Sequence, residues 1–458
     1  MPARRVALPL ICLIAVVHGF AYLIHQQPDW NVSWTDQGGY KMLGHGIAES
    51  GEFTRYPGTT PFVAEAIRTP GYPMFVAAVY RIAGESHTAV AVAQILVFTL
   101  LCLVVFDLAR RLLPERQAIA AALLTAVYAP LPYFAALVLT ELWTTFALVV
   151  TIAATWRAIH SGRIVWYVVA GILYAYTALC RPVFVLLPVF MIGAGLLLFC
   201  RAANWRRETL KWAALAAAVA VTLAPWFAYN KRHFDVIGIS PVGIGRPIFE
   251  SSWQGIWPGR LQAQLTDTAA SALSDRDLAI EVRRIAAEQS LDPEPMLRYV
   301  TQWREIRKIW ETPTDPQQRA LARIIGQNEY LRVGLENIRH DLSGFLKRRV
   351  VRGQFVLWAA EIPVRHSEIN SLPTIVIRLI WLPQVVLFGL ACAGAIALVV
   401  ARQWTAALLL ITPLVYVGSV HFVMLTESRQ SLPVKPLLLI LAVAGGQALI
   451  DRARHART

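Results

Sequence analysis

Charged residues are scarce in this chain. Asp, Glu, Lys and Arg make up 16% of its 458 residues, whereas 56% of the residues are hydrophobic. Soluble domains carry about a quarter charged residues, so this composition excludes an ordinary soluble globular fold. Apolar runs near the roughly 20 residues that cross a bilayer recur along the chain instead. The sequence therefore predicts an all-α polytopic membrane protein.

Cysteine is also scarce, and no pattern brings cysteines together. The five cysteines lie inside or at the ends of apolar segments, and none belongs to a Cys-x-x-Cys motif: Cys12, Cys102, Cys180, Cys200 and Cys392. This distribution predicts neither a disulfide nor a thiolate metal site. The sequence shows no internal repeat, no low-complexity tract and no convincing strand pattern.

About ten apolar segments, within a range of roughly 8–13, approach the length of a transmembrane helix. They cover residues 6–24, 73–83 continuing with 88–108, 118–137, 142–159, 164–179, 183–200, 210–229, 375–400, 405–425 and 433–450. The second segment exceeds one span. We therefore expect its first part to form an interfacial helix.

Basic residues fix the expected orientation, because short cytoplasmic loops are rich in Lys and Arg. One side of the alternating path collects Arg4, Arg5, Arg110, Arg111, Arg116, Arg157, Arg163, Arg201, Arg206, Arg207, Lys211, Arg402, Arg452, Arg454 and Arg457. Both termini are thus expected in the cytoplasm of a plasma (bacterial inner) membrane protein, with the N-terminal run as a retained signal anchor. The net charge of +14 then comes mostly from basic residues in the cytoplasmic loops and tails, and it does not indicate a nucleic-acid partner.

Three regions follow from this path. Residues 1–229 form an N-terminal transmembrane module with a first outer loop at 25–72, residues 230–372 form an extracytoplasmic and mostly helical domain, and residues 373–458 form C-terminal transmembrane helices with a cytoplasmic tail.

Short helices are expected outside the membrane as well. Residues 38–47 suit a helix lying in the interface plane. In the outer domain, periodicity predicts amphipathic helices over 278–289, 295–310 and 317–351, and the Gly- and Pro-rich stretch 238–259 is predicted to be a loop.

Ionisable residues recur at the outer ends of several expected spans. They are Asp36, Glu141, Arg181, Glu427, Arg429 and Lys435. Carboxylates and guanidinium groups at one membrane depth suit transfer from a lipid phosphate donor to a hydroxyl or amine. Arg181 and Arg429 would stabilise the phosphate that leaves, because guanidinium binds phosphate bidentately. Asp36 would deprotonate the acceptor as general base, and a single displacement would invert the anomeric carbon.

The motifs resemble, in their order along the chain, those of the C-type (GT-C) membrane glycosyltransferases. They are Asp36 with Tyr40, Arg68-Thr69-Pro70-Gly71-Tyr72-Pro73, Thr140-Glu141, Arg181-Pro182, Pro225-Trp226, and Glu427-Ser428-Arg429 with Pro433 and Pro436. Within this class the chain is similar to the family 39 branch, which includes protein O-mannosyltransferases and the aminoarabinose transferase acting on lipid A. The resemblance runs to about residue 260 and resumes at the last spans.

The resemblance implies a GT-C bundle, a polyprenyl-phosphate-linked sugar as donor, and a lipid, glycan or protein acceptor on the outer face. It implies catalysis by Asp36 and phosphate contacts from the arginines. With the residue pattern, Asp36 and Glu141 become the catalytic candidates, and the candidates for substrate or phosphate binding are Tyr40, Arg68, Tyr72, Arg181, Glu427, Arg429 and Lys435. Some relatives use a divalent metal ion, for which Glu141 or Glu427 would serve, but no ligand cluster is diagnostic. The chain departs from many members at Gln37, where a second acid is common, and at Gln430, where an aromatic residue is common.

Simpler roles remain open for the same residues. Asp36 would suit a helix cap, Arg181 would suit a side chain that reaches the headgroups, and Glu427 would suit a partner for Arg429 alone. A secondary transporter and a lipid-linked glycan polymerase or ligase are the alternative functions. Transporter sites lie near the bilayer midplane and usually come with inverted repeats, which this sequence lacks.

Overall fold

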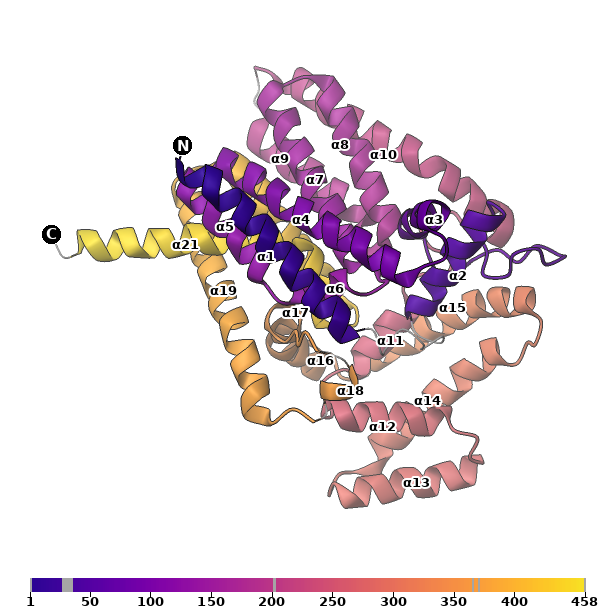
Figure 1. Ribbon diagram of the computed structural model, residues 1–458. Coiled ribbons are helices and arrows are strands. Elements are labelled where there is room, and N and C mark those ends of the chain that lie inside the picture. Colours follow the sequence, from indigo (N-terminus) through magenta and orange to yellow (C-terminus); the bar gives the residue numbers. More distant parts are fainter. Residues whose placement is uncertain (1, 27–35, 201–202, 365, 370, 457–458) are drawn as a thin grey trace.

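The computed structural model describes residues 2–26, 36–200, 203–364, 366–369 and 371–456 (Figure 1). Regular structure in these ranges is helical throughout, with no strand. Part of the expected first outer loop, at 27–35, lies outside the described residues, and so do the basic residues expected at 201 and 457.

The N-terminal region supplies most of the bundle. Its elements are α1 (Pro2–Gln26), α2 (Asp36–Glu49), α3 (Gly71–Ala83), α4 (His87–Leu112), α5 (Glu115–Val127), α6 (Pro130–Ala135), α7 (Thr140–Ser161), α8 (Ile164–Cys180), η2 (Pro182–Leu186), α9 (Leu187–Phe199) and α10 (Trp205–Phe234). The C-terminal region completes it with α19 (Thr374–Val400), α20 (Trp404–Val423), η4 (Ser428–Val434) and α21 (Lys435–His455).

Eight helices in the described part of the chain are long and apolar enough to cross a membrane, namely those at 4–26, 87–112, 140–161, 182–199, 205–234, 374–400, 404–423 and 428–455. Helix α8 is equally apolar but shorter. The continuous helix expected over 118–137 is wrong: the chain forms α5 and α6 there. Pro130 and Pro132 account for this break, because proline removes a backbone donor and clashes with the preceding turn.

The other short helices of the N-terminal region agree with the sequence. Helix α2 covers the stretch expected as an interfacial helix and extends it slightly at both ends. Helix α3 is separate from α4, because the chain turns at Gly84 with a φ of 74°. Ser86 then caps α4 by accepting the amide hydrogen of Ala89.

The region between α10 and α19 is helical. It contains α11 (Gly245–Trp253), α12 (Gly259–Ala270), α13 (Asp275–Glu288), α14 (Pro293–Glu311), α15 (Pro316–His340), α16 (Leu342–Arg348), the π-helical turn η3 (Arg349–Gly353), α17 (Gln354–Ala359) and α18 (His366–Ile369). Figure 1 shows α12, α13 and α14 extending away from the bundle.

Two expectations for this region need correction. The single helix expected over 317–351 ends at His340, because Asp341 leaves the helical conformation and caps α16 by accepting the amide hydrogen of Gly344 at 3.0 Å. The stretch expected as a loop at 238–259 contains α11. Its Phe249 and Trp253 are buried in a separate aromatic core, which stabilises a helix that local composition disfavours.

Helices α19 and α21 pack closely along one another. Two glycines face each other at this contact. A Cβ at Gly394 would lie 2.0 Å from the carbonyl oxygen of Leu441, and a Cβ at Gly445 would lie 2.0 Å from that of Leu390. Small residues allow membrane helices to approach in this way.

Replacing Gly445 with valine should therefore force α21 away from α19. We expect Gly445→Val to lower the unfolding free energy by about 1–3 kcal/mol, the usual cost of overpacking. The matched control is Gly446→Val, because a Cβ there meets nothing within 4 Å. Thermal unfolding in detergent measures both, and equal melting temperatures for the two variants would contradict this packing.

Candidate functional site

Asp36 is the first residue of α2, and its carboxylate lies between two arginines. Arg68 Nη2 approaches Oδ1 at 3.2 Å, and Arg429 Nη1 approaches Oδ2 at 3.3 Å. The side chain is half exposed. Gly39 allows this geometry, because a Cβ at that position would lie 2.7 Å from the Arg68 Nε atom.

The two arginines also set the ionisation of Asp36. Burial acts to raise the pKa of this carboxyl group, but the charges and hydrogen bonds of Arg68 and Arg429 outweigh it and hold the pKa below its usual value. Asp36 is therefore a carboxylate at neutral pH, and it accepts hydrogen bonds only.

Aromatic side chains support Arg68. Its guanidinium lies 4.0 Å from the ring centroid of Tyr40, close enough for a cation–π interaction. Tyr40 in turn meets the edge of Tyr72 at 5.1 Å between ring centroids. Tyr72 is fully buried, and its hydroxyl donates to Gln94 Oε1 at 3.2 Å. Tyr72 thus packs against Tyr40, which in turn contacts Arg68.

Glu141 begins the first turn of α7 and is 3% exposed. Its Oε1 lies 3.5 Å from Arg429 Nη1 and 3.7 Å from Arg181 Nη1. Arg181 extends from the break between α8 and η2. Within the described part of the chain, the other carboxylate oxygen of Glu141 and the Arg181 Nη1 atom are buried without a hydrogen bond. The site therefore retains polar atoms that a bound group would satisfy.

Arg429 connects the three acids of the site. Besides Asp36 and Glu141, its Nε donates to Glu427 Oε2 at 2.8 Å. Glu427 and Gln430 form a capping box that fixes the start of η4, and hence the position of Arg429. Glu427 and Arg429 do form a pair, but the simpler alternative that they pair with each other alone is wrong, because Arg429 has three acidic partners among the described residues.

A cavity of about 140 Å³ lies at this cluster. Six of the nine residues expected from the sequence line it: Asp36, Tyr40, Arg68, Glu141, Arg181 and Arg429. Tyr72, Glu427 and Lys435 are not among its lining residues. Lys435 is buried, and its ammonium donates to the carbonyl oxygen of Trp358 at 2.6 Å, with the ring of the same residue beside it. Lys435 thus anchors the start of α21 in this structure.

Glu361 is an acid near this cavity that sequence reasoning missed. It is 7% exposed, and one of its carboxylate oxygens has no hydrogen bond to any residue that the structure describes. Burial raises the pKa of this carboxyl group, although Ser428 and Lys435 oppose the effect. Its sequence neighbours carry no motif, so only the packing of α17 against η4 places it near the site.

A second, larger cavity adjoins the first. It has a volume of about 560 Å³ and shares Ile67 and Pro182 with the Asp36 cavity. Its walls are mainly apolar and come from η2, α20, the 239–247 segment, α14 and α15, with Val183, Leu186 and Val420 among them. Arg246 and Arg323 also line it. We call this cavity the apolar groove. Sequence patterns could not predict it, because its walls come from segments far apart in the chain.

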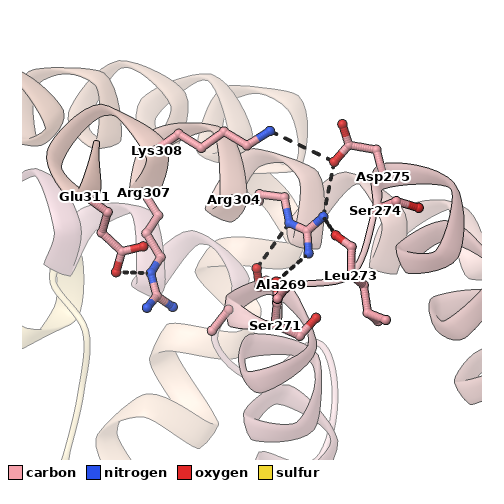
Figure 2. Close-up of a pocket in the computed structure, with 11 residues that line it drawn as sticks. Ala269, Ser271, Leu273, Ser274, Asp275, Arg304, Arg307, Lys308 and Glu311 are labelled. Carbon is pink, nitrogen blue, oxygen red and sulfur yellow. Dashed lines mark hydrogen bonds and ion pairs between the residues drawn. The ribbon is translucent and has the colours of Figure 1, made fainter. Parts of the chain in front are cut away.

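A further cavity of about 330 Å³ lies between α12 and α14 in the outer region. Figure 2 shows Arg304 at its centre, directed into the 269–275 turn. The guanidinium donates to the carbonyl oxygens of Ala269, Ser271 and Leu273 and pairs with Asp275 at 3.1 Å. These contacts hold the 269–275 turn in place, so Arg304 has a structural role at this cavity.

The residues at the Asp36 cavity do not form a metal-binding set. Among the described residues, no group of three or more His, Cys, Asp and Glu side chains is placed to hold a metal ion. Asp36, Glu141 and Glu427 instead share Arg429 as their counter-ion. The divalent metal ion that the resemblance allows therefore has no supporting ligand set at this site.

Comparison with solved structures identifies the fold. The chain superimposes with a TM-score of 0.50 on an Archaeoglobus fulgidus oligosaccharyltransferase, AglB, in complex with an inhibitory peptide and a dolichol-phosphate, at 15% sequence identity. The match covers 99% of this chain and 51% of AglB, so the chain spans about half the length of that protein. An Archaeoglobus fulgidus oligosaccharyltransferase tethered to an acceptor peptide matches at 13% identity and a TM-score of 0.50, over 98% of this chain and 50% of that one. The chain thus has the fold of the C-type membrane glycosyltransferases.

A more particular match is found within the chain. Residues 67–229 match the dolichyl-phosphate-mannose-protein mannosyltransferase family, which confirms the resemblance drawn from the motifs. ArnT from Cupriavidus metallidurans bound to undecaprenyl phosphate is 16% identical over 96% of this chain and 78% of its own, with a TM-score of 0.39 that adds nothing to the fold assignment. No match to a curated protein is found.

The two acids that flank Arg429 should differ in their effect on stability. Glu141→Gln leaves Arg181 and Arg429 without their buried counter-ion, so we expect a loss of about 3 kcal/mol in unfolding free energy. Glu427→Gln removes a partner that is 40% exposed, and it should cost below about 1 kcal/mol. Thermal unfolding in detergent separates the two, and an equal loss in both variants would contradict a buried charge network.

Proposed function

We propose that this protein transfers a sugar from a polyprenyl-phosphate donor to a lipid, glycan or protein acceptor at the outer face of the membrane. One observation carries the proposal: the Asp36 carboxylate lies between Arg68 and Arg429, in a cavity that Arg181 also lines and that adjoins the apolar groove. The fold and the family match support a transferase of the GT-C type, and AglB and ArnT are bound to lipid phosphates in their structures.

The donor would occupy both cavities. Its polyprenyl chain needs an apolar lining, which the groove supplies, and its phosphate needs cations, which the Asp36 cavity supplies. Ile67 and Pro182 line both spaces, so the two parts of one molecule can bind without a break. Arg181 and Arg429 would contact the phosphate, with Arg68 on the opposite side of Asp36.

Asp36 would act as the general base. The acceptor oxygen or nitrogen attacks the anomeric carbon, the bond from that carbon to the phosphate oxygen breaks, and Asp36 takes the proton from the acceptor. The phosphate leaves as an anion that Arg181 and Arg429 stabilise. The lowered pKa keeps Asp36 ionised at neutral pH, and a weak base suffices because the acceptor becomes acidic as its bond to carbon forms. Attack opposite the phosphate inverts the anomeric carbon.

Glu141 would keep the leaving-group arginines in place. Its buried carboxylate lies within 3.7 Å of Arg181 and within 3.5 Å of Arg429, from different elements of the fold. Phosphate binding would reorganise these contacts, because the same guanidinium groups serve both anions. Tyr40 would hold Arg68 beside Asp36, Tyr72 would support Tyr40, and Glu427 and Lys435 would fix the η4 segment.

The proposal extends to the placement in the membrane. Residues 1–229 and 373–458 would form the two transmembrane parts, with 230–372 as an extracytoplasmic domain above the site. Both termini would lie in the cytoplasm of a bacterial inner membrane protein, as the basic loops predict. The helix ends that carry Asp36, Glu141, Arg181 and Arg429 would then face the periplasm. A transporter gains no support, because these charges lie at helix ends.

Replacing Asp36 tests the base directly. Asp36→Asn should abolish sugar transfer, because the amide cannot accept the acceptor proton, while binding of polyprenyl phosphate persists. The matched control is Asp235→Asn, which changes an exposed carboxylate at the end of α10 that pairs with Lys231. Transfer of radiolabelled sugar to membrane acceptors measures both. Full activity in Asp36→Asn would remove this residue from the mechanism.

The groove is tested by filling it. Leu186 lines the groove and is 54% exposed, so Leu186→Trp should fit the fold and occupy the space of the lipid chain. We expect a higher KM for long polyprenyl donors and a smaller change for donors with short chains. Val189→Trp is the control, because Val189 lies on α9, is 61% exposed and does not line the groove. The same chain-length dependence in both variants would place the lipid elsewhere.

A further inference from the structure

Arg349 is a buried cation that none of the site motifs includes. It begins the π-helical turn η3 and is 1% exposed. Burial, with a smaller contribution from Arg348, lowers the pKa of its guanidinium to about 10, so it stays charged at neutral pH. No carboxylate among the described residues forms an ion pair with it. A buried charge without a counter-ion requires another form of compensation.

That compensation comes from the end of α20. Arg349 Nε donates to the carbonyl oxygen of Phe422 at 2.9 Å, and Nη2 donates to the carbonyl oxygens of His421 and Met424. These are the unsatisfied carbonyl groups at a helix C-terminus, where the helix dipole favours a cation. Arg349 thus caps α20 from the outer region of the protein.

The same guanidinium reaches the segment that follows α20. Its Nη2 donates to the Thr426 hydroxyl, and its Nη1 donates to Gln254 Oε1. Gln254 holds the backbone of Thr426 on both sides, by accepting its amide hydrogen at 3.0 Å and donating to its carbonyl oxygen at 2.6 Å. Thr426 is therefore fixed by side chains of the outer region.

Arg429 lies three residues after Thr426, and Glu427 between them begins the capping box of η4. We propose that Arg349 is a positioning residue, which sets the place of Arg429 in the site by holding the carbonyl oxygen of Met424 and the hydroxyl of Thr426 at the end of α20. Leu425 adds to this arrangement, since its amide donates to the carbonyl oxygen of Pro247 at 2.8 Å. The role rests on the proposed function, because Arg429 is the residue through which Arg349 acts.

Lysine cannot replace Arg349 in this network. Its ammonium is a point charge with three donors, whereas the observed guanidinium bonds diverge toward acceptors on three sides. Arg349→Lys should therefore lower kcat about 10–100-fold, the range expected when a group near the reacting atoms is displaced by an ångström. The donor KM should rise less, because the charge on the leaving phosphate develops in the transition state. Arg352→Lys is the control, since Arg352 is exposed in the same turn and donates to the carbonyl oxygen of Gly255.

Two measurements separate positioning from a general loss of folding. First, Arg349→Lys should have little further effect on kcat in an Arg429→Lys background, whereas equal effects in both backgrounds would overturn the role. Second, amide hydrogen exchange of peptides covering 424–430 should accelerate in Arg349→Lys and stay unchanged in Arg352→Lys. Unchanged exchange in both would also overturn it. Thr426→Val, which removes one acceptor, provides a milder variant with the same expected directions.

The exchange measurement does not depend on activity. A wild-type protein that transfers no sugar from any polyprenyl-phosphate donor would contradict the proposed function. In that case, exchange at 424–430 would still decide whether Arg349 holds this segment.

Discussion

The ion pairs of Arg429 are the constraint on which the site depends. One guanidinium faces Asp36 at the start of α2, Glu141 at the start of α7 and Glu427 at the start of η4. Three carboxylates this close would repel one another without it. Arg68 and Arg181 complete the charge balance from either side. The acidic and basic side chains of the cavity therefore hold one another in place through ion pairs. Under the proposed function, the polar atoms without a hydrogen bond would contact the phosphate.

The ion pairs of Arg429 lie where the helix bundle meets the outer region of the protein. The apolar groove reaches them along η2 and α20, which belong to the bundle, and the outer region reaches them through Arg349 and the Thr426 segment. A substrate with a long apolar chain and an anionic head would match both at once. The outer region therefore contributes to the site under this proposal, because its buried Arg349 would fix the segment that precedes Arg429.

The sequence predicted the bundle well, because spans, interfacial helices and outer helices each have a local pattern. It also predicted six of the cavity residues, since isolated ionisable groups in apolar sequence are conspicuous. Other features depend on packing and had no local signal. The contact of Lys435 with the Trp358 carbonyl oxygen has no local signal, and Glu361 and Arg349 lie in stretches without a motif. Hydropathy alone predicts one continuous helix over 118–137. The break after α5 follows instead from Pro130.

The order of the site residues along the chain has a consequence for how the protein is made. Asp36 and Arg429 form a direct contact although they are separated by 393 positions. Spans enter the membrane in the order of their synthesis, so Asp36, Glu141 and Arg181 are all in place long before Arg429 emerges. Until then the buried carboxylate of Glu141 lacks one of its two cations. The last hairpin thus completes the charge balance of the Asp36 cavity, and a chain that stops before α20 lacks it.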